Sequence, residues 1–270
     1  MTNTVDQKEI QQFSKDSSAW WDENGPFKPL HRLNPVRMRY IKAQICQHYG
    51  RDVKSLKPFE GLRILDVGCG GGLVCEPMAR LGAEVTGADA DAVAIAVARE
   101  HAKISGLDIA YYNGAAEEIL SSSSRAQPRD LSRSDSDKIP PLPTVGRDDN
   151  GKFDVVLALE IIEHVSDPTA FVESVSALVK PGGLVIFSTL NRNPKSFLLG
   201  IVAAEHIFRW VPRGTHSWKK FIRPSELVRL AEAAELKAED ITGLILDPLT
   251  NEFRLTKSDL DVNYLFTCKN

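Results

Sequence analysis

The sequence predicts an α/β fold, an open and mostly parallel β-sheet with helices on both faces. Short apolar runs alternate with amphipathic stretches along the chain, and several of these runs end in Gly or Asp. Such alternation is typical of βαβ units, whose parallel strands are buried on both faces. With 270 residues, the chain is long enough for one large core with additions.

Seven strands are expected, the first five of them in βαβ units. They are predicted at residues 63–70, 83–90, 109–116, 153–160, 183–191, 241–248 and 262–269. Amphipathic helices are predicted between and after them, at residues 72–82, 91–106, 169–183 and 223–236. Lys-Pro-Gly-Gly at 180–183 is interpreted as a helix stop and a turn. In such a sheet, ligands bind at the carboxyl ends of the strands, so functional residues are expected there.

Two segments depart from this regular pattern. Residues 121–150 are rich in Ser, Pro, Arg and Asp and poor in large apolar residues, which predicts a disordered surface insertion, with a regulatory or phosphorylated segment as the alternative. Residues 195–213 are mostly apolar with basic residues at both ends, which predicts an amphipathic helix too short to span a bilayer. This helix either lies in the headgroup region of a membrane or packs over the active site.

Charge and cysteine content exclude several classes of protein. The 33 basic and 36 acidic residues give a formal charge of -3, so no nucleic-acid partner is expected. The four cysteines are scattered and predict neither a disulfide framework nor a zinc site.

The first residues lack the features of a presequence, which favours a bacterial cytoplasm with inner-membrane contact over the matrix side of the mitochondrial inner membrane.

The turn after the first strand is rich in glycine and predicts a nucleoside-binding loop. Gly68, Gly70 and Gly72 allow a tight turn and a close approach of the backbone to a ligand. A dinucleotide and a methyl donor both fit such a loop. Asp66, two residues before the first glycine, favours the methyl donor, because its carboxylate would repel a pyrophosphate but suits the cationic groups of S-adenosylmethionine.

Asp89 closes the second strand, 21 residues after Gly68. From this position a carboxylate can accept hydrogen bonds from both ribose hydroxyls of a nucleoside. The alternative is a helix N-cap for the segment that begins at Asp91.

Together, the glycine-rich turn, Asp89 and Lys-Pro-Gly-Gly resemble the seven-stranded, Rossmann-like class I methyltransferases. Five longer stretches are similar to the ubiquinone-biosynthesis O-methyltransferases, which methylate polyprenyl phenols. These stretches lie at residues 20–41, 158–168, 187–196, 214–227 and 241–253. The insertion at 121–150 is longer than the corresponding connection of that family.

The resemblance implies transfer of a methyl group from S-adenosylmethionine to ring hydroxyls of polyprenyl-hydroxyphenol and demethylubiquinol intermediates. It also implies peripheral membrane contact and other ubiquinone-biosynthesis proteins as partners. Residues 1–58 are expected to form an N-terminal helical lid, with Trp20 and Trp21 as aromatic anchors or as part of the isoprenoid channel, and residues 59–270 the methyltransferase domain. His216 is a candidate for contact with the substrate ring, but not for catalysis.

The resemblance assigns cofactor-binding roles to four residues, Arg37, Gly68, Asp89 and Leu159. An arginine suits the methionine carboxylate of the cofactor, which it can bind in a bidentate fork. Gly70 and Asp66 are expected to join them from the glycine-rich turn. Leu159 is the apolar member of the set, and an ordinary core leucine is its alternative reading.

Glu160, Glu163 and His164 stand close together after the fourth strand and are the candidates for the chemistry. Their spacing permits a divalent cation such as Mg²⁺ or Mn²⁺ without requiring one, and the resemblance implies a divalent-metal requirement at these positions. A cation there would lower the pKa of a phenol and orient it. Without a metal, His164 is the expected general base, and Glu160 lies beside the acceptor hydroxyl.

Three other functions fit part of the pattern. A methyltransferase acting on another small substrate shares the cofactor loop but lacks the stretches at 27–35 and 188–196. A non-catalytic scaffold of a biosynthetic complex would have no reason to keep Glu160, Glu163 and His164. An NAD-dependent dehydrogenase is disfavoured by Asp66.

Overall fold

The computed structural model describes residues 4–6, 10, 14–119, 151–197, 218–247, 250 and 252–270. The predicted insertion at 121–150, most of the predicted amphipathic helix at 195–213, and His216 lie outside the described residues. Within the described part of the chain, no helix is both long enough and apolar enough to cross a bilayer.

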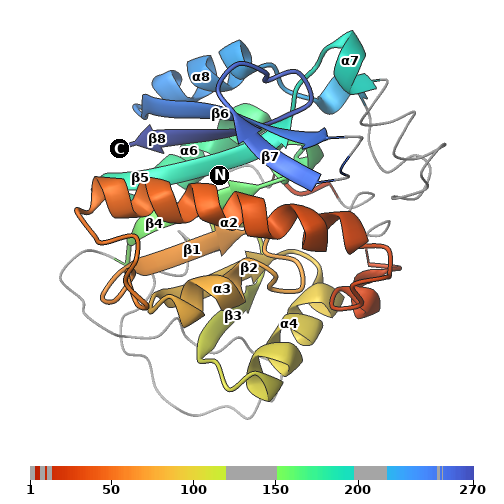
Figure 1. Cartoon of the computed structure of the whole chain (residues 1–270), viewed down its shortest axis with the longest axis vertical. Coiled ribbons are helices and arrows are strands. Elements are labelled where there is room, and N and C mark those ends of the chain that lie inside the picture. Colours follow the sequence, from red (N-terminus) through yellow and green to blue (C-terminus); the bar gives the residue numbers. More distant parts are fainter. Residues whose placement is uncertain are drawn as a thin grey trace.

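The described residues form one sheet of eight strands in the order β3-β2-β1-β4-β5-β8-β6-β7 (Figure 1). The strands are β1 (Arg63–Val67), β2 (Glu84–Asp89), β3 (Ile109–Asn113), β4 (Phe153–Leu159), β5 (Val179–Leu190), β6 (Lys237–Asp247), β7 (Glu252–Thr256) and β8 (Asn263–Lys269). Strands β1 to β5 pair in parallel, whereas β8, β6 and β7 add antiparallel pairs. The predicted fold class is confirmed.

Two details of the sheet differ from the sequence prediction. The count of seven strands was wrong by one, because β7 was missed: it is a short strand at the end of the sheet that pairs with β6, and Phe253 and Leu255 are its apolar residues. Lys-Pro-Gly-Gly does not simply end a helix, because β5 already begins at Val179 and continues through these residues. The pairing of β4 with β5 shifts in register there, between Phe153 and Val155.

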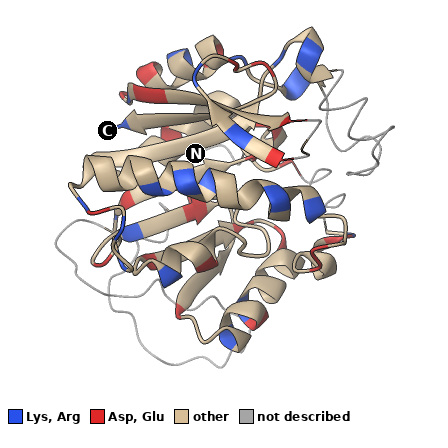
Figure 2. Ribbon diagram, viewed as in Figure 1, with Lys and Arg blue, Asp and Glu red and all other residues tan. Residues whose placement is uncertain are grey.

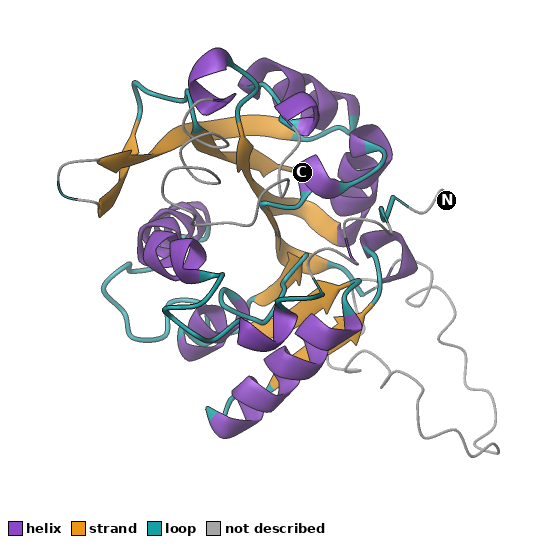
Figure 3. Cartoon of the chain, turned by 90° about the vertical axis from the view of Figure 1, so that its right-hand side faces the viewer, coloured by secondary structure: helices purple, strands orange, loops and turns teal. Residues whose placement is uncertain are grey.

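Helices cover both faces of the sheet, as the edge-on view in Figure 3 shows. The helical elements are η1 (Ser17–Ala19), α2 (Lys28–His48), α3 (Cys75–Arg80), α4 (Ala92–Ile104), η2 (Ile162–His164), α6 (Pro168–Leu178), α7 (Pro194–Ser196), η4 (Trp218–Lys220) and α8 (Pro224–Ala233). One buried core lies between the sheet and α2, α3 and α4, and a second lies between the sheet and α6 and α8.

Successive side chains along each strand pack alternately into one core and the other. Ile64 packs in the core beside α2, whereas its neighbour Leu65 packs in the core beside α6. In the same way, Val155 and Val156 of β4 belong to opposite cores. Because successive strand residues point to opposite faces, a continuous apolar run is what a strand buried on both sides requires.

Carboxylates at the helix N-termini fix where the chain turns away from the sheet. Asp91 caps α4 by accepting a hydrogen bond from the Val93 N–H at 2.9 Å. Asp167 caps α6 by accepting from the Thr169 and Ala170 N–H groups, and Pro168 occupies the first helical position. The loops that follow β2 and β4 at the carboxyl edge of the sheet are therefore short and well defined.

Candidate active site

The glycine-rich turn after β1 adopts backbone conformations that favour glycine. Gly68 and Gly70 have φ angles of 73° and 52°. A Cβ atom on Gly68 would lie 2.8 Å from the Ile161 side chain, and one on Gly70 would lie 2.4 Å from the Trp20 ring. The turn thus needs glycine both for its backbone angles and for close packing.

Asp89 holds this turn against the end of β2. Its Oδ2 accepts a hydrogen bond from the Gly70 N–H at 2.8 Å, and its Oδ1 accepts from the Asp91 N–H at 2.8 Å. The N-cap of α4 is Asp91 and not Asp89, so the alternative reading of Asp89 as a helix cap is wrong. Burial raises the pKa of the Asp89 carboxyl, and the two N–H donors oppose that shift.

Asp66 lies inside the molecule on β1, with 3% of its surface exposed. The Cys75 thiol donates a hydrogen bond to its Oδ2 at 3.3 Å. Burial raises the pKa of Asp66 to about 7, although the Arg37 charge and the Cys75 hydrogen bond favour the ionised form. A cation placed beside Asp66 would therefore stabilise the ionised carboxylate.

Arg37 is the buried member of a basic helix. Basic residues recur along α2, which has no acidic residue, and Figure 2 shows them as blue bands on the ribbon. Arg37 is only 4% exposed, and its Nη2 donates to Asn34 Oδ1 at 3.0 Å. Its Nε is buried and has no hydrogen-bond partner among the described residues. Burial lowers the pKa of Arg37, and the charges of Glu160 and Asp66 oppose that shift.

Glu160 and Glu163, called the acidic pair below, lie just beyond β4. Glu160 has a left-handed backbone with φ of 54°, which is uncommon for a residue other than glycine. Glu163 is 2% exposed, and its Oε1 is buried without a hydrogen-bond partner in the described part of the chain. Burial raises the pKa of Glu163 to about 7, the Glu160 charge adds to the rise, and His164 opposes it.

The three candidate metal ligands are neighbours, but they do not form a recognisable metal centre. The described residues contain no group of three or more His, Cys, Asp and Glu side chains arranged to hold a metal ion. The Oε1 of Glu163, which has no hydrogen-bond partner among the residues described, is nevertheless the kind of buried oxygen that a cation or a hydroxyl would satisfy. Leu159, the last residue of β4, is 7% exposed and packs in the core beside α2.

Trp20 and Trp21 were predicted from the sequence as lid anchors without naming their partners, and other contacts of the site were missed. Trp20 packs against Gly70 and Gly71, stacks on Phe27 at a centroid distance of 3.9 Å, and so covers part of the glycine-rich turn. Trp21 Nε1 donates to the Gly71 carbonyl oxygen at 2.9 Å. Ser188, Thr189 and Asn263, which hydrogen-bond to the acidic pair, were also missed. Polar residues at the ends of otherwise apolar strands were the signal for these three.

Comparison with known proteins agrees with this arrangement of fold and site. A family model described as a methyltransferase domain matches residues 38–241. The structure of magnesium protoporphyrin IX methyltransferase from Synechocystis with bound SAH is similar, with a TM-score of 0.56 at 13% identity, covering 97% of this chain and 99% of that one. The cyclase SpnF shares the fold with a TM-score of 0.55 at 14% identity, covering 100% of this chain and 97% of that one. Such distant similarity shows the fold alone. The chain is a methyltransferase of the Rossmann-like class I fold.

Relatives with higher sequence identity show which family of methyltransferases the chain belongs to. The ubiquinone biosynthesis O-methyltransferase of Dinoroseobacter shibae is 46% identical over 264 residues, covering 98% of this chain and 96% of the relative. Its counterpart in Chelativorans sp. is 45% identical over 262 residues, covering 97% and 92%. The chain belongs to this family of O-methyltransferases, as the sequence predicted. The roles assigned to individual site residues stay predictions.

Proposed function

We propose that this enzyme transfers a methyl group from S-adenosylmethionine to ring hydroxyls of polyprenyl-hydroxyphenol and demethylubiquinol intermediates. One observation carries the proposal: β1 and β4 pair in parallel, with Val67 opposite Ala158, so the glycine-rich turn and the acidic pair follow neighbouring strand ends at one edge of the sheet. The β1 end, where a cofactor would bind, therefore lies next to the β4 end, where an acceptor would bind. The names of the relatives support methylation of an oxygen atom in ubiquinone biosynthesis.

On this proposal, each part of the cofactor is bound by a different set of residues. Arg37, whose Nε has no hydrogen-bond partner in the part of the chain that the structure describes, binds the methionine carboxylate, and Asp66 faces the cationic ammonium and sulfonium end. Asp89 accepts hydrogen bonds from the ribose hydroxyls, while the hydrogen bonds that it accepts from the Gly70 and Asp91 N–H groups keep the turn in place. Gly68, Gly70 and Leu159 complete the cradle, the two glycines by their close approach and the leucine by apolar packing.

The acidic pair and His164 then act on the acceptor. In the reaction, the acceptor oxygen forms a bond to the methyl carbon, the carbon–sulfur bond breaks, and the phenolic proton leaves to a base. A phenol with a pKa of about 10 is mostly neutral at pH 7, so the site must favour its ionised form. His164 is the proposed base, with Glu160 beside the hydroxyl. A divalent cation held by Glu160, Glu163 and His164 would lower the pKa of the acceptor hydroxyl when bound.

We further propose that residues 1–58 act as a lid and that residues 195–213 contact a membrane. The packing of Trp20 on Gly70 and Gly71 supports a lid over the cofactor end. The apolar run at 195–213, which is outside the described residues apart from its first three, supports peripheral contact with the inner membrane of a bacterial cell. Other proteins of ubiquinone biosynthesis are the proposed partners.

A methyl-transfer assay with a polyprenyl catechol, run with and without a chelator, tests the proposal. We expect Glu163→Ala to lower kcat by more than about 100-fold, because it removes a buried carboxylate from the acceptor end. Calorimetry with S-adenosylhomocysteine should give an affinity close to that of the wild type. The control is Glu173→Ala, which removes an exposed carboxylate from α6. Full turnover by Glu163→Ala would contradict the assignment of the acceptor site, and full turnover with chelator would remove the cation from it.

A further inference from the structure

Each glutamate of the acidic pair is held by hydrogen bonds to one of its two oxygens. Ser188 Oγ donates to Glu160 Oε1 at 2.7 Å, and Asn263 Nδ2 donates to the same oxygen at 3.0 Å. Thr189 Oγ1 donates to Glu163 Oε2 at 2.8 Å. The other oxygen of Glu163, Oε1, is buried without a hydrogen-bond partner among the described residues. The contacts therefore fix the two carboxylates without using all of their acceptor capacity.

The three donors come from strands that do not carry the glutamates. Ser188 and Thr189 are consecutive residues near the end of β5, and Asn263 is the first residue of β8. The two strands pair antiparallel, with Leu190 opposite Asn263. Ser188 and Thr189 are fully buried, and Asn263 is 9% exposed. A buried hydroxyl or amide that donates to a carboxylate restricts its rotation far more than solvent does.

The backbone at Glu160 is also held by β5. The Glu160 N–H donates to the Ser188 carbonyl oxygen at 2.9 Å, so Ser188 contacts this residue through both backbone and side chain. The left-handed conformation of Glu160, with φ of 54°, is unfavourable for a residue with a Cβ atom. Such a conformation persists where the surrounding contacts hold it, which is the case here.

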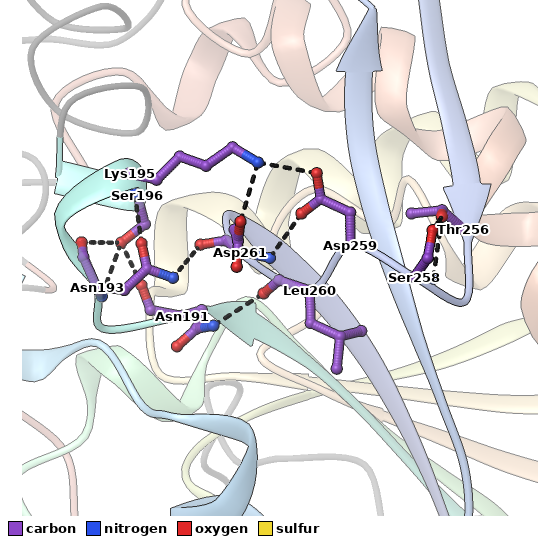
Figure 4. Close-up of polar contacts among 9 residues, drawn as sticks. All are labelled: Asn191, Asn193, Lys195, Ser196, Thr256, Ser258, Asp259, Leu260 and Asp261. Atoms are coloured by element: carbon purple, nitrogen blue, oxygen red, sulfur yellow. Dashed lines mark hydrogen bonds and ion pairs between the residues drawn. The ribbon is translucent and has the colours of Figure 1, made fainter.

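A polar anchor positions the start of β8, as Figure 4 shows. Asn191 Nδ2 donates to the Leu260 carbonyl oxygen at 2.9 Å, and Asn193 Nδ2 donates to the Asp261 carbonyl oxygen at 2.6 Å. The Lys195 ammonium group lies 2.8 Å from Asp259 Oδ2 and 3.0 Å from Asp261 Oδ2. The loop after β5 thus binds the residues immediately before Asn263.

We propose that Ser188, Thr189 and Asn263 are positioning residues that orient the acidic pair for the acceptor. The inference rests on the proposed function, because it takes the acidic pair as the acceptor end of the site. Each donor fixes one carboxylate oxygen, which leaves the other available to an acceptor hydroxyl or a divalent cation. Asn263 also has a buried Oδ1 without a hydrogen-bond partner in the described part of the chain, which places a further acceptor oxygen beside Glu160.

Thr189→Val tests the inference, because valine keeps the shape of threonine and removes the hydroxyl. Titration with Mn²⁺, followed by electron paramagnetic resonance of the free ion, measures the affinity of the acidic pair independently of turnover. We expect about 10-fold weaker Mn²⁺ binding and a kcat lowered by about the same factor, the usual effect of losing a hydrogen bond to a metal-binding carboxylate. Thr189→Ser keeps the hydroxyl and should restore both quantities to within about twofold of wild type.

Two controls separate positioning from folding and from cofactor binding. Thr86→Val removes a buried hydroxyl from β2, and within the described residues Thr86 makes no hydrogen bond to either glutamate. It should leave Mn²⁺ affinity unchanged. Calorimetry with S-adenosylhomocysteine should give the same affinity for Thr189→Val as for wild type. If Thr189→Val does not fold, Asn263→Ala, which removes a donor to Glu160, is measured in the same way.

The outcomes distinguish the inference from the proposed function. Wild-type Mn²⁺ affinity and wild-type kcat in the folded variant would overturn the inference. A wild-type enzyme that binds S-adenosylhomocysteine but no Mn²⁺ would remove the cation from the proposed function. In that case kcat alone decides: a loss in Thr189→Val that Thr189→Ser restores supports positioning, and equal kcat values contradict it. Failure of wild type to methylate the catechol would overturn the proposed function itself.

Discussion

The two ends of the site are held together in different ways. At the β1 end, backbone N–H groups make the hydrogen bonds: Gly70 donates to Asp89, and Gly68 donates to the Ala88 carbonyl oxygen. The indole ring of Trp20 packs directly on this turn. At the β4 end, side chains of β5 and β8 bind the acidic pair. The conformation of the glycine-rich turn depends on a short stretch of sequence, whereas its contact with Trp20 and the side-chain contacts of the acidic pair depend on which distant elements become neighbours. The first therefore follows from a short motif and the second from the topology.

At the β1 end, the largest expected effect comes from Gly70→Ala, which disturbs the glycine-rich turn. The new Cβ would lie 2.4 Å from the Trp20 ring, and φ at this position is 52°. We expect a loss of about 1–3 kcal/mol in the free energy of unfolding from overpacking alone. A displaced turn would no longer fit the cofactor, so the affinity for S-adenosylhomocysteine should fall by more than about 10-fold. This factor corresponds to a loss of about 1.4 kcal/mol in binding free energy. Urea unfolding and calorimetry measure the two effects.

Gly106→Ala is the matched control for that prediction. Gly106 also has a positive φ, of 65°, but nothing lies within 4 Å of the position its Cβ would take. This variant should show only the cost of the backbone angle, about 1 kcal/mol, and unchanged cofactor affinity. A double-mutant cycle of Gly70→Ala with Trp20→Ala should give a coupling energy of about 1 kcal/mol. Strictly additive effects would show that Trp20 does not restrict the turn.

An intermediate effect is expected of pH on the affinity for S-adenosylmethionine, because Asp66 changes its ionisation. Its folded-state pKa of about 7 lies above the ordinary value, so the ligand-free carboxyl is neutral below pH 7 and ionised above it. A cationic cofactor binds the ionised form better. The affinity for S-adenosylmethionine should therefore rise about tenfold between pH 6 and pH 8, measured by calorimetry. Asp66→Asn should bind more weakly and lose this dependence; an equal pH dependence in both proteins would assign it to another group.

The smallest effect is expected from Lys195→Met, at the polar anchor before β8. Lys195 is 45% exposed, and its partners Asp259 and Asp261 are 31% and 55% exposed. Exposed ion pairs of this kind contribute less than about 1 kcal/mol to the free energy of unfolding, and salt weakens them further. Urea unfolding at low and high salt measures the contribution. A loss of several kcal/mol would mean that the anchor stabilises the whole fold, and not only the start of β8.

The sequence predicted most of the sheet because its strands are buried on both faces and so have continuous apolar runs. Strand β7 was missed because it is only five residues long, lies at the end of the sheet and has two apolar residues, Phe253 and Leu255. The glycine turn, Asp66, Asp89 and the acidic pair were found because each stands within a few residues of a strand end.

The remaining contacts of the site could not be predicted from spacing. Asn263 lies 103 residues after Glu160 in the sequence, and the two meet only because β8 pairs with β5 in one particular register. Trp20 precedes Gly70 by a long stretch of chain that contains all of α2. Local propensity carries no information about either meeting, since both depend on how distant elements pack.

A structure of the enzyme with bound S-adenosylhomocysteine tests most directly whether the cofactor end and the acceptor end are correctly assigned. We predict that the ribose hydroxyls lie within hydrogen-bond distance of Asp89, that the carboxylate of the ligand contacts Arg37, and that the sulfur atom faces Glu160. A sugar bound far from Asp89, or a sulfur atom turned away from the acidic pair, would contradict this assignment.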